Sequence, residues 1–281
     1  MHSIDFDKEF VKGSAAFEGF LADWWLEKSN DPAHRRAYKN ISSKMHQILS
    51  EAGISSPKLI VDYACGNGAI LDSLGNRFPE TNIIAIDGSK KMLSLAKSSL
   101  EQAGPQPLIE FLHSPLPNFS LPEEIADVVL FLFPNITINS KERRLVRKQL
   151  HMDVLTLKTA KFLAKWNEID CDFSADECLE DILDSRAITS NIHRILNKGG
   201  FWFHVEYANA PRNQWDEIDK ITTLFEESAW PVSVETDEIR REFRLIKSLY
   251  FRSSVMLDVY EQSGDPEDRD GGYVISVLQA L

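Results

Sequence analysis

Short apolar runs alternate with amphipathic segments through the middle of the chain. Helical spacing of apolar residues predicts helices near 68–77, over 89–102 and over 188–196, the last stopped by Gly199 and Gly200. Continuous apolar strands between such helices predict an α/β fold, a doubly wound parallel sheet covered on both faces. The predicted strands are 59–61, 83–86, 109–112, 127–133 and 201–205.

Both ends of the chain depart from this alternation. Residues 5–52 carry apolar and aromatic residues at helical spacing, and Gly53 is expected to end the last of these helices. Near the other end, 248–260 and 273–281 have the pattern of two long strands, and the polar connection between them leaves no room for a helix. They should pair as an antiparallel hairpin. The expected sheet is therefore seven-stranded and mostly parallel, with an antiparallel C-terminal edge.

The segment 139–187 is surplus to this scheme. About 50 residues separate the fourth strand from the next helix, where a connection of about two to six is usual. Helical patterning in this segment indicates a helical insertion after the fourth strand, and its acidic tract indicates a solvated face. The predicted organisation is an N-terminal helical cap over 1–52 and a domain over 53–281 that carries the insertion.

Composition narrows the classes of partner. The net charge is −12, with 43 acids against 31 bases, whereas phosphate binding needs a concentrated basic surface. Three cysteines without a pairing pattern favour a reducing compartment. The N-terminus does not resemble a signal peptide, and no apolar run approaches the roughly 18 residues of a membrane span. We expect a cytoplasmic protein with neither a nucleic-acid nor a membrane partner.

The stretch VDYACGNGAI places Gly66 and Gly68 at the first strand-to-helix turn. Ligands of doubly wound sheets bind beyond the carboxyl ends of the strands, and glycine lets the backbone approach them closely. A dinucleotide fingerprint needs a third glycine where Leu71 stands. Asp62 would repel a pyrophosphate but suits an ammonium group, and Asp87, ending the second strand, suits both hydroxyls of a ribose. Ribose plus an amino-acid ammonium describes S-adenosylmethionine (SAM).

Five features in order resemble the class I SAM-dependent methyltransferases. LIVDYACGNGAI is similar to that family's motif hhhDxxCGxG, and IIAIDGSKKML, DVVLFLF and LNKGGFWFHVEY resemble its second motif, its fourth strand, and its helix, Gly-Gly turn and fifth strand. The terminal hairpin matches its strand order. The resemblance covers roughly 53–138 and 186–281. It implies a Rossmann-like fold, SAM as the cofactor and the transfer of a methyl group.

The resemblance also implies which residues contact the cofactor. Gly66 and Gly68 would admit the methionine part, Asp62 would engage its ammonium group directly or through water, and Asp87 would hold the ribose. The expected set is Asp62, Tyr63, Ala64, Gly66, Gly68, Asp87, Gly88, Ser89, Met92, Ser114 and Phe133.

Five positions in this region have simpler interpretations or depart from the family pattern. Ala64 replaces the family's first glycine, and Ser114 stands where the family often has an acid for the adenine amino group. Cys65 is interpreted as a small buried residue without an activated thiolate. A turn cap at Asp62 and a helix N-cap at Asp87 are the alternatives that stay open.

The sequence identifies the residues around the methyl acceptor less clearly than those around the cofactor. Methyl transfer mainly requires that the nucleophile, the methyl group and the sulfur be held in line. A base is needed only if the acceptor must lose a proton. The catalytic candidates follow the fourth and fifth strands: Asn135 as a hydrogen-bond donor, Glu206 as a base and Tyr207 as an aromatic face for the sulfonium. Tyr38, Asn135 and Asn139 are the candidate acceptor-binding residues, and the Trp24-Trp25 pair could roof the pocket or pack the helical cap. No ligand spacing predicts a metal.

We therefore expect an enzyme, a SAM-dependent methyltransferase acting on a small molecule in an enclosed pocket. Base methylation is disfavoured, because the segment after the fourth strand, Phe133-Pro134-Asn135, lacks the second proline and the aromatic residue that nucleic-acid amino methyltransferases often carry there. One alternative is a SAM cyclase or lyase on the same fold, in which the amine attacks within the cofactor. It would form a four-membered-ring amino acid such as azetidine-2-carboxylate plus methylthioadenosine. The other alternative is a non-catalytic SAM-binding subunit.

Overall fold

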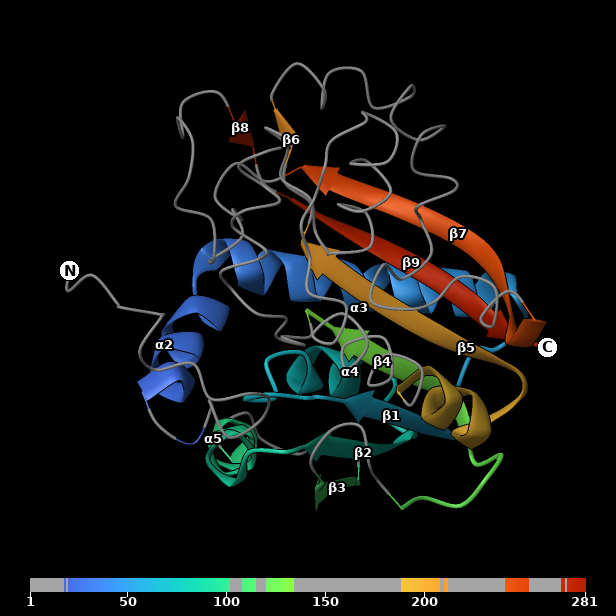
Figure 1. Ribbon diagram of the computed structural model, residues 1–281, viewed down its shortest axis with the longest axis horizontal. Coiled ribbons are helices and arrows are strands. Elements are labelled where there is room, and N and C mark those ends of the chain that lie inside the picture. The colour runs from blue at the N-terminus through green and yellow to red at the C-terminus, as the bar shows by residue number, and fades with distance from the viewer. Residues whose placement is uncertain are drawn as a thin grey trace, which may run out of the picture.

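A seven-stranded sheet forms the centre of the protein (Figure 1). The computed structural model describes residue 18 and residues 20–101, 108–114, 120–133, 188–207, 210–211, 241–252, 269–270 and 272–281. The predicted insertion over 139–187 lies outside these residues. The strands of the sheet are β1 (Leu59–Tyr63), β2 (Asn82–Asp87), β3 (Ile109–His113), β4 (Ala126–Leu132), β5 (Leu196–Tyr207), β7 (Phe243–Arg252) and β9 (Gly272–Ala280).

The strand order is β3-β2-β1-β4-β5-β9-β7, and the first five strands are parallel. The chain builds outward from β1 to β3 and then returns to place β4 on the other side of β1. The carboxyl ends of β1 and β4 thus flank the topological switch point, where open α/β sheets bind ligands. The α/β, Rossmann-like prediction is confirmed.

The C-terminal edge is antiparallel, as predicted. Strand β9 inserts between β5 and β7 and runs antiparallel to both. Strand β7 begins at Phe243, five residues before the expected start at Ser248, because buried Phe243 and half-buried Leu245 alternate with exposed Arg244. Residues 253–260 of the expected strand lie outside the described residues. Two short strands, β6 (Ala210–Pro211) and β8 (Arg269–Asp270), form a separate antiparallel pair.

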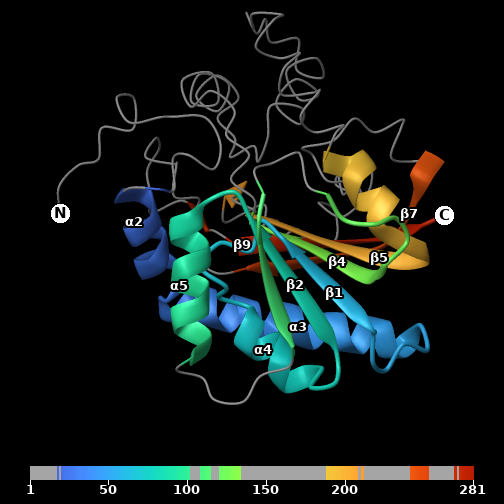
Figure 2. The same cartoon turned by 90° about the horizontal axis from the view of Figure 1, so that it is seen from below.

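Helices cover both faces of the sheet (Figure 2). On one face, α3 (Pro32–Glu51) and α4 (Leu71–Arg77) share a hydrophobic core with inward residues of β1, β4 and β5. On the other face, the helix over 188–195 packs on the alternate residues of the same strands. The remaining helices with printed bounds are α2 (Phe20–Ser29) and α5 (Lys90–Glu101). In the described part of the chain, no helix is long and apolar enough to span a bilayer.

The limits of α3 follow from local signals. Asp31 is its N-cap, and one carboxylate oxygen accepts hydrogen bonds from the main-chain N–H groups of Ala33 and His34. The helix ends at Glu51, and Gly53 then adopts a φ of +83°, so the predicted glycine stop is confirmed.

Two sequence predictions need correction. Gly199 and Gly200 do not stop the preceding helix, because strand β5 already begins at Leu196. They form an irregularity in which β5 advances from Leu196 to Phe201 while β4 advances only from Ala126 to Val128. Gly199 takes a φ of +78°, which explains the glycine there. In addition, α4 begins at Leu71 rather than near residue 68, because the glycine turn occupies the preceding residues.

Candidate functional site

The turn between β1 and α4 has an unusual backbone. Ala64, Gly66 and Gly68 all have positive φ, at 62°, 55° and 71°. Ala64 adopts this conformation although the left-handed region disfavours a Cβ. Gly68 is required for a second reason: a Cβ added to it would lie 2.9 Å from the Cβ of Ala96 on α5. The turn therefore packs directly against a helix.

Asp62 lies near the end of β1, at the base of this turn. Its side chain is buried, with 1% exposure, and its Oδ2 has no hydrogen-bond partner among the described residues. Burial, and then the nearby charge of Asp87, raise the pKa of Asp62 to about 7. A buried carboxylate without a partner is costly to keep. A carboxylate oxygen in this position can pair with a cationic group.

Asp87 ends β2 and ties that strand to the glycine turn. Its Oδ2 accepts the N–H of Gly66 at 2.8 Å, and its Oδ1 accepts the N–H of Ser89 at 2.8 Å. Burial raises the pKa of Asp87, and the hydrogen bonds from Ser89 and Gly66 partly oppose this shift. Each carboxylate oxygen has further acceptor capacity. Asp87 can thus accept two ribose hydroxyls while it holds the turn.

The N-terminus of α5 is capped by Ser89 instead of Asp87. The N–H of Met92 donates to the Ser89 hydroxyl at 3.1 Å, and both side chains are buried. On the neighbouring strand, the N–H of Ser114 donates to the Asp87 carbonyl at 2.9 Å. The structure thus gathers Asp87, Gly88, Ser89, Met92 and Ser114 around the carboxyl end of β2.

The side chain of Tyr63 lies on the other face of the sheet from Asp62. Tyr63 is fully buried in the opposite layer, where its ring stacks on Phe131 with 5.3 Å between centroids. Successive residues of a strand face opposite sides of the sheet, so Asp62 and Tyr63 diverge, and Tyr63 can contribute only main-chain atoms to the site. Cys65, as expected, is buried, and burial raises the pKa of its thiol.

Phe133 marks the end of β4, next to β1 in the sheet. Its φ of +46° is rare for a bulky residue, and its N–H donates to the Val205 carbonyl at 2.7 Å. Backbone strain of this kind concentrates at functional sites. Its ring lies edge-on to three others, with centroids at 5.9 Å to Tyr38, 6.3 Å to His34 and 6.1 Å to Tyr273.

The catalytic candidates stay predictions. Asn135 and Asn139 lie outside the described residues. Glu206 and Tyr207 occupy the carboxyl end of β5, opposite Val274 and Tyr273 of β9. Their strand positions place them at the same edge of the sheet as the glycine turn. Among the residues that the structure describes, no cluster of histidine, cysteine or acidic side chains could hold a metal ion.

Sequence reasoning did not find how the N-terminal helices meet the turn. The indole Nε1 of Trp25 lies 3.5 Å from where a Cβ of Gly66 would be. The amide of Asn67 donates to the hydroxyl of Ser29 at 2.8 Å, and both residues are buried. Helix α2 therefore lies directly on the glycine turn. No spacing signal connects these segments.

Two contacts hold this N-terminal segment to the start of α5. The carboxylate of Glu18 accepts the N–H of Lys90 at 2.6 Å, and Asp23 pairs with Lys91 at 2.8 Å. The charge of Glu18 also contributes to the raised pKa of Asp87. The segment thus reaches the region that the ribose would occupy.

Comparison with known proteins agrees with this geometry. The family model described as a methyltransferase domain matches residues 60–151. A tRNA (guanine-N(7)-)-methyltransferase of Clostridium perfringens is 32% identical over 162 residues, which cover 52% of this chain and 71% of that protein. The chain belongs to the class I SAM-dependent methyltransferases. Other members of this family match over shorter stretches, such as malonyl-[acyl-carrier protein] O-methyltransferase 2 of Coxiella burnetii, 33% identical over 79 residues.

The chain matches less than a third of the length of the Coxiella relative. The aligned part is 28% of this chain and 30% of the Coxiella methyltransferase. Among solved structures, magnesium protoporphyrin IX methyltransferase of Synechocystis PCC 6803, with bound S-adenosylhomocysteine, aligns with a TM-score of 0.50. That alignment covers 93% of this chain and 97% of that protein at 13% identity, so it shows the shared fold.

Proposed function

We propose that this protein transfers the methyl group of SAM to a small-molecule acceptor. The observation that carries the proposal is the buried carboxylate oxygen of Asp62, which has no partner among the described residues and lies beside the glycine turn. Asp62 fits the cofactor ammonium, and Asp87 fits its ribose hydroxyls. The positive φ values of Gly66 and Gly68 shape the turn that would face the methionine part.

The protein's contribution to such a reaction is alignment and exclusion of water. SAM supplies an electrophilic methyl group on a good leaving group. Asp62 and Asp87 hold the two ends of the molecule, and Phe133 stands at the neighbouring strand end. Helix α2, with Trp25 against the turn, covers this region from outside. Orientation of the reacting groups supplies much of the rate in reactions that need little acid–base help.

The nature of the acceptor is inferred from charge. A net charge of −12 is unfavourable for a polyanion such as tRNA, although one relative acts on tRNA by its name. The residues after Phe133, which include Asn135 and Asn139, lie outside the described residues. We infer a small molecule, and methylation of tRNA with no small molecule accepted would contradict this.

Product analysis tests the reaction class. Purified protein is incubated with SAM alone and with panels of small-molecule acceptors and tRNA, and the nucleoside product is identified by mass spectrometry. Acceptor-dependent S-adenosylhomocysteine supports methyl transfer. Methylthioadenosine from SAM alone would instead identify the cyclase or lyase. Tight SAM binding with no turnover across the panels would favour the non-catalytic subunit.

Replacing Asp87 by alanine is expected to reduce SAM affinity at least about tenfold, because charge-assisted hydrogen bonds to the ribose are lost. Calorimetry measures the change. Asp127→Ala is the matched control, since Asp127 lies at the amino end of β4 and accepts the N–H of Lys58 at 2.6 Å. It should lower stability and leave SAM affinity unchanged. If the folded Asp87→Ala variant binds SAM as tightly as the wild type, Asp87 does not hold the ribose.

SAM affinity is also expected to depend on pH. Only the ionised form of Asp62 attracts an ammonium group, and the pKa of Asp62 is raised to about 7 in the ligand-free protein. Affinity should therefore rise about tenfold between pH about 6 and pH about 8. Asp62→Asn should flatten this profile in calorimetric titrations. A flat profile in the wild type would show that Asp62 does not hold the ammonium.

A further inference from the structure

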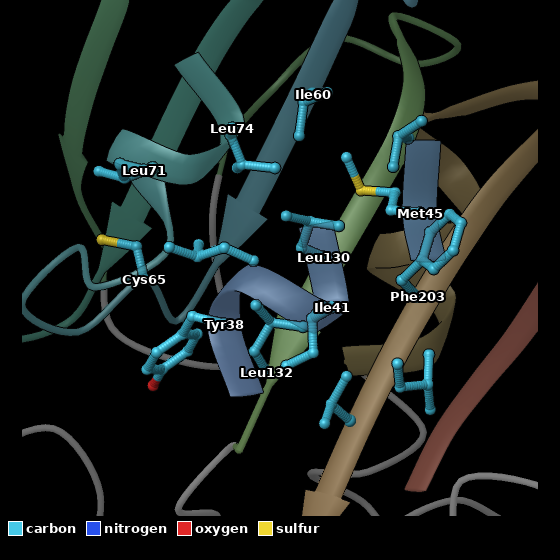
Figure 3. Packing of buried hydrophobic residues seen from close by; sticks show 14 of the residues in the cluster. Tyr38, Ile41, Met45, Ile60, Cys65, Leu71, Leu74, Leu130, Leu132 and Phe203 are labelled. Carbon is cyan, nitrogen blue, oxygen red and sulfur yellow. The ribbon is translucent and has the colours of Figure 1, made fainter. Parts of the chain in front are cut away.

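The hydroxyl of Tyr38 is a second polar group without a partner near the turn. Tyr38 is 6% exposed, and among the described residues no side chain or main-chain group hydrogen-bonds to its hydroxyl. Figure 3 shows its ring packed at the edge of the aliphatic core, close to Cys65, with the oxygen pointing away from the packed side chains. The hydroxyl is therefore aimed out of the aliphatic core.

Two neighbours define what this hydroxyl can do. The ring of Tyr38 meets Phe133 edge-on at the end of β4, with 5.9 Å between centroids. Asp62 lies close enough that its charge, after burial, raises the pKa of the Tyr38 hydroxyl further above its usual value. The phenol thus stays protonated and remains a hydrogen-bond donor. This donor packs on Phe133, and the Oδ2 of Asp62, on the neighbouring strand β1, is an acceptor without a partner among the described residues.

This pairing matches an α-amino acid, which carries a cation and an anion on one carbon. Asp62 supplies an acceptor for the ammonium group but repels the carboxylate, which needs a donor. We propose that the Tyr38 hydroxyl donates a hydrogen bond to the α-carboxylate of the cofactor, so that α3 is part of the cofactor site. This assignment rests on the proposed function and moves Tyr38 from the acceptor pocket to the cofactor.

The N-terminal helices are held in place for such a role. Asp31 fixes the start of α3, and its other carboxylate oxygen lies 2.8 Å from Nδ1 of buried His34. His34 and Tyr38, one turn apart, both lie against Phe133. Through Ser29, the preceding helix bonds to Asn67 in the glycine turn. The position of Tyr38 relative to Asp62 is therefore determined by packing on both sides.

Three ligands that differ at the amino-acid end test the proposal. S-adenosylhomocysteine carries both charged groups, its decarboxylated analogue retains only the ammonium, and methylthioadenosine has neither. Tyr38→Phe should weaken S-adenosylhomocysteine binding about tenfold, the effect of a hydrogen bond to a charged group. It should leave the affinities of the other two ligands unchanged. Asp62→Asn should weaken both ammonium-bearing ligands and leave methylthioadenosine unchanged.

Tyr273→Phe is the matched control, because Tyr273 also packs on Phe133 but its hydroxyl accepts a hydrogen bond from Asn40 at 2.7 Å. It should affect all three affinities equally or not at all. Methylthioadenosine binding reports whether each variant is folded.

The outcomes separate this inference from the proposed function. If Tyr38→Phe weakens the binding of S-adenosylhomocysteine but not of the other two ligands, the role of the Tyr38 hydroxyl is supported. Two results would overturn this role and leave the proposed function intact. One is that Tyr38→Phe binds all three ligands as tightly as the wild type. The other is that it loses as much affinity for decarboxylated S-adenosylhomocysteine as for S-adenosylhomocysteine. A wild-type protein that binds none of the three ligands would overturn both.

Discussion

Replacing Asp62 by asparagine is expected to weaken SAM binding about thirtyfold or more and, at pH about 8, to stabilise the ligand-free protein. The two effects have one origin. The Asp62 carboxylate is buried, and its Oδ2 has no partner among the described residues. It therefore interacts favourably with a ligand cation and unfavourably with its own surroundings. The neutral amide loses the first interaction and relieves the second.

The pH dependence of stability has a definite sign. The pKa of Asp62 is raised to about 7 in the folded protein, whereas an aspartate in an unfolded chain titrates near about 4. The folded state therefore holds the proton more tightly, and stability falls as pH rises from about 4 through about 7. Asparagine has no such penalty. The gain from Asp62→Asn should be largest above pH about 8 and vanish near pH about 4.

Thermal denaturation with and without SAM measures both effects. A gain on the order of 1 kcal/mol corresponds to about 2–4 °C in melting temperature at this chain length. Added SAM should raise the melting temperature of the wild type and barely change that of the variant. Asp72→Asn, at an exposed aspartate in the first turn of α4, is the control and should change neither. A variant that is less stable than wild type at pH about 8 would show that Asp62 is structurally paired.

Replacing Gly68 by alanine is expected to destabilise the fold and abolish SAM binding at ordinary concentrations. Gly68 has a φ of +71°, and the new Cβ would lie 2.9 Å from both the Ala96 Cβ and Leu71 Cδ1. Backbone strain contributes roughly 1–2 kcal/mol and overpacking roughly 1–3 kcal/mol. Gly53→Ala is the matched control, because Gly53 has a φ of +83° but nothing within 4 Å of the added Cβ. Gly53→Ala should therefore lose only the stability that corresponds to backbone strain.

A second substitution distinguishes overpacking from strain. Ala96→Gly removes the Cβ that the new side chain meets, so Gly68→Ala with Ala96→Gly should recover part of the lost stability in denaturant titrations. Comparable losses in Gly68→Ala and Gly53→Ala, with no recovery in the double variant, would contradict close packing of the turn on α5.

The sheet and its turn were predictable because their signals are local. Apolar runs, helical periodicity and glycines at positive φ report the conformation of a few neighbouring residues, and two aspartates at successive strand ends must meet at one edge of a parallel sheet. The errors were local as well. Gly199 and Gly200 resemble a helix stop in the sequence but form an irregularity within β5, and strand alternation turns the side chain of Tyr63 to the face opposite Asp62.

The sequence by itself determined the family, the parallel sheet and the acid–glycine pattern, because each is encoded in short spacing. Only the tertiary structure decided that Trp25 lies on Gly66, that Ser29 bonds to Asn67 and that the ring of Tyr38 packs on Phe133. These contacts join segments separated by tens of residues. They depend on how helix and sheet surfaces pack, and packing between distant segments leaves no periodic trace in the chain.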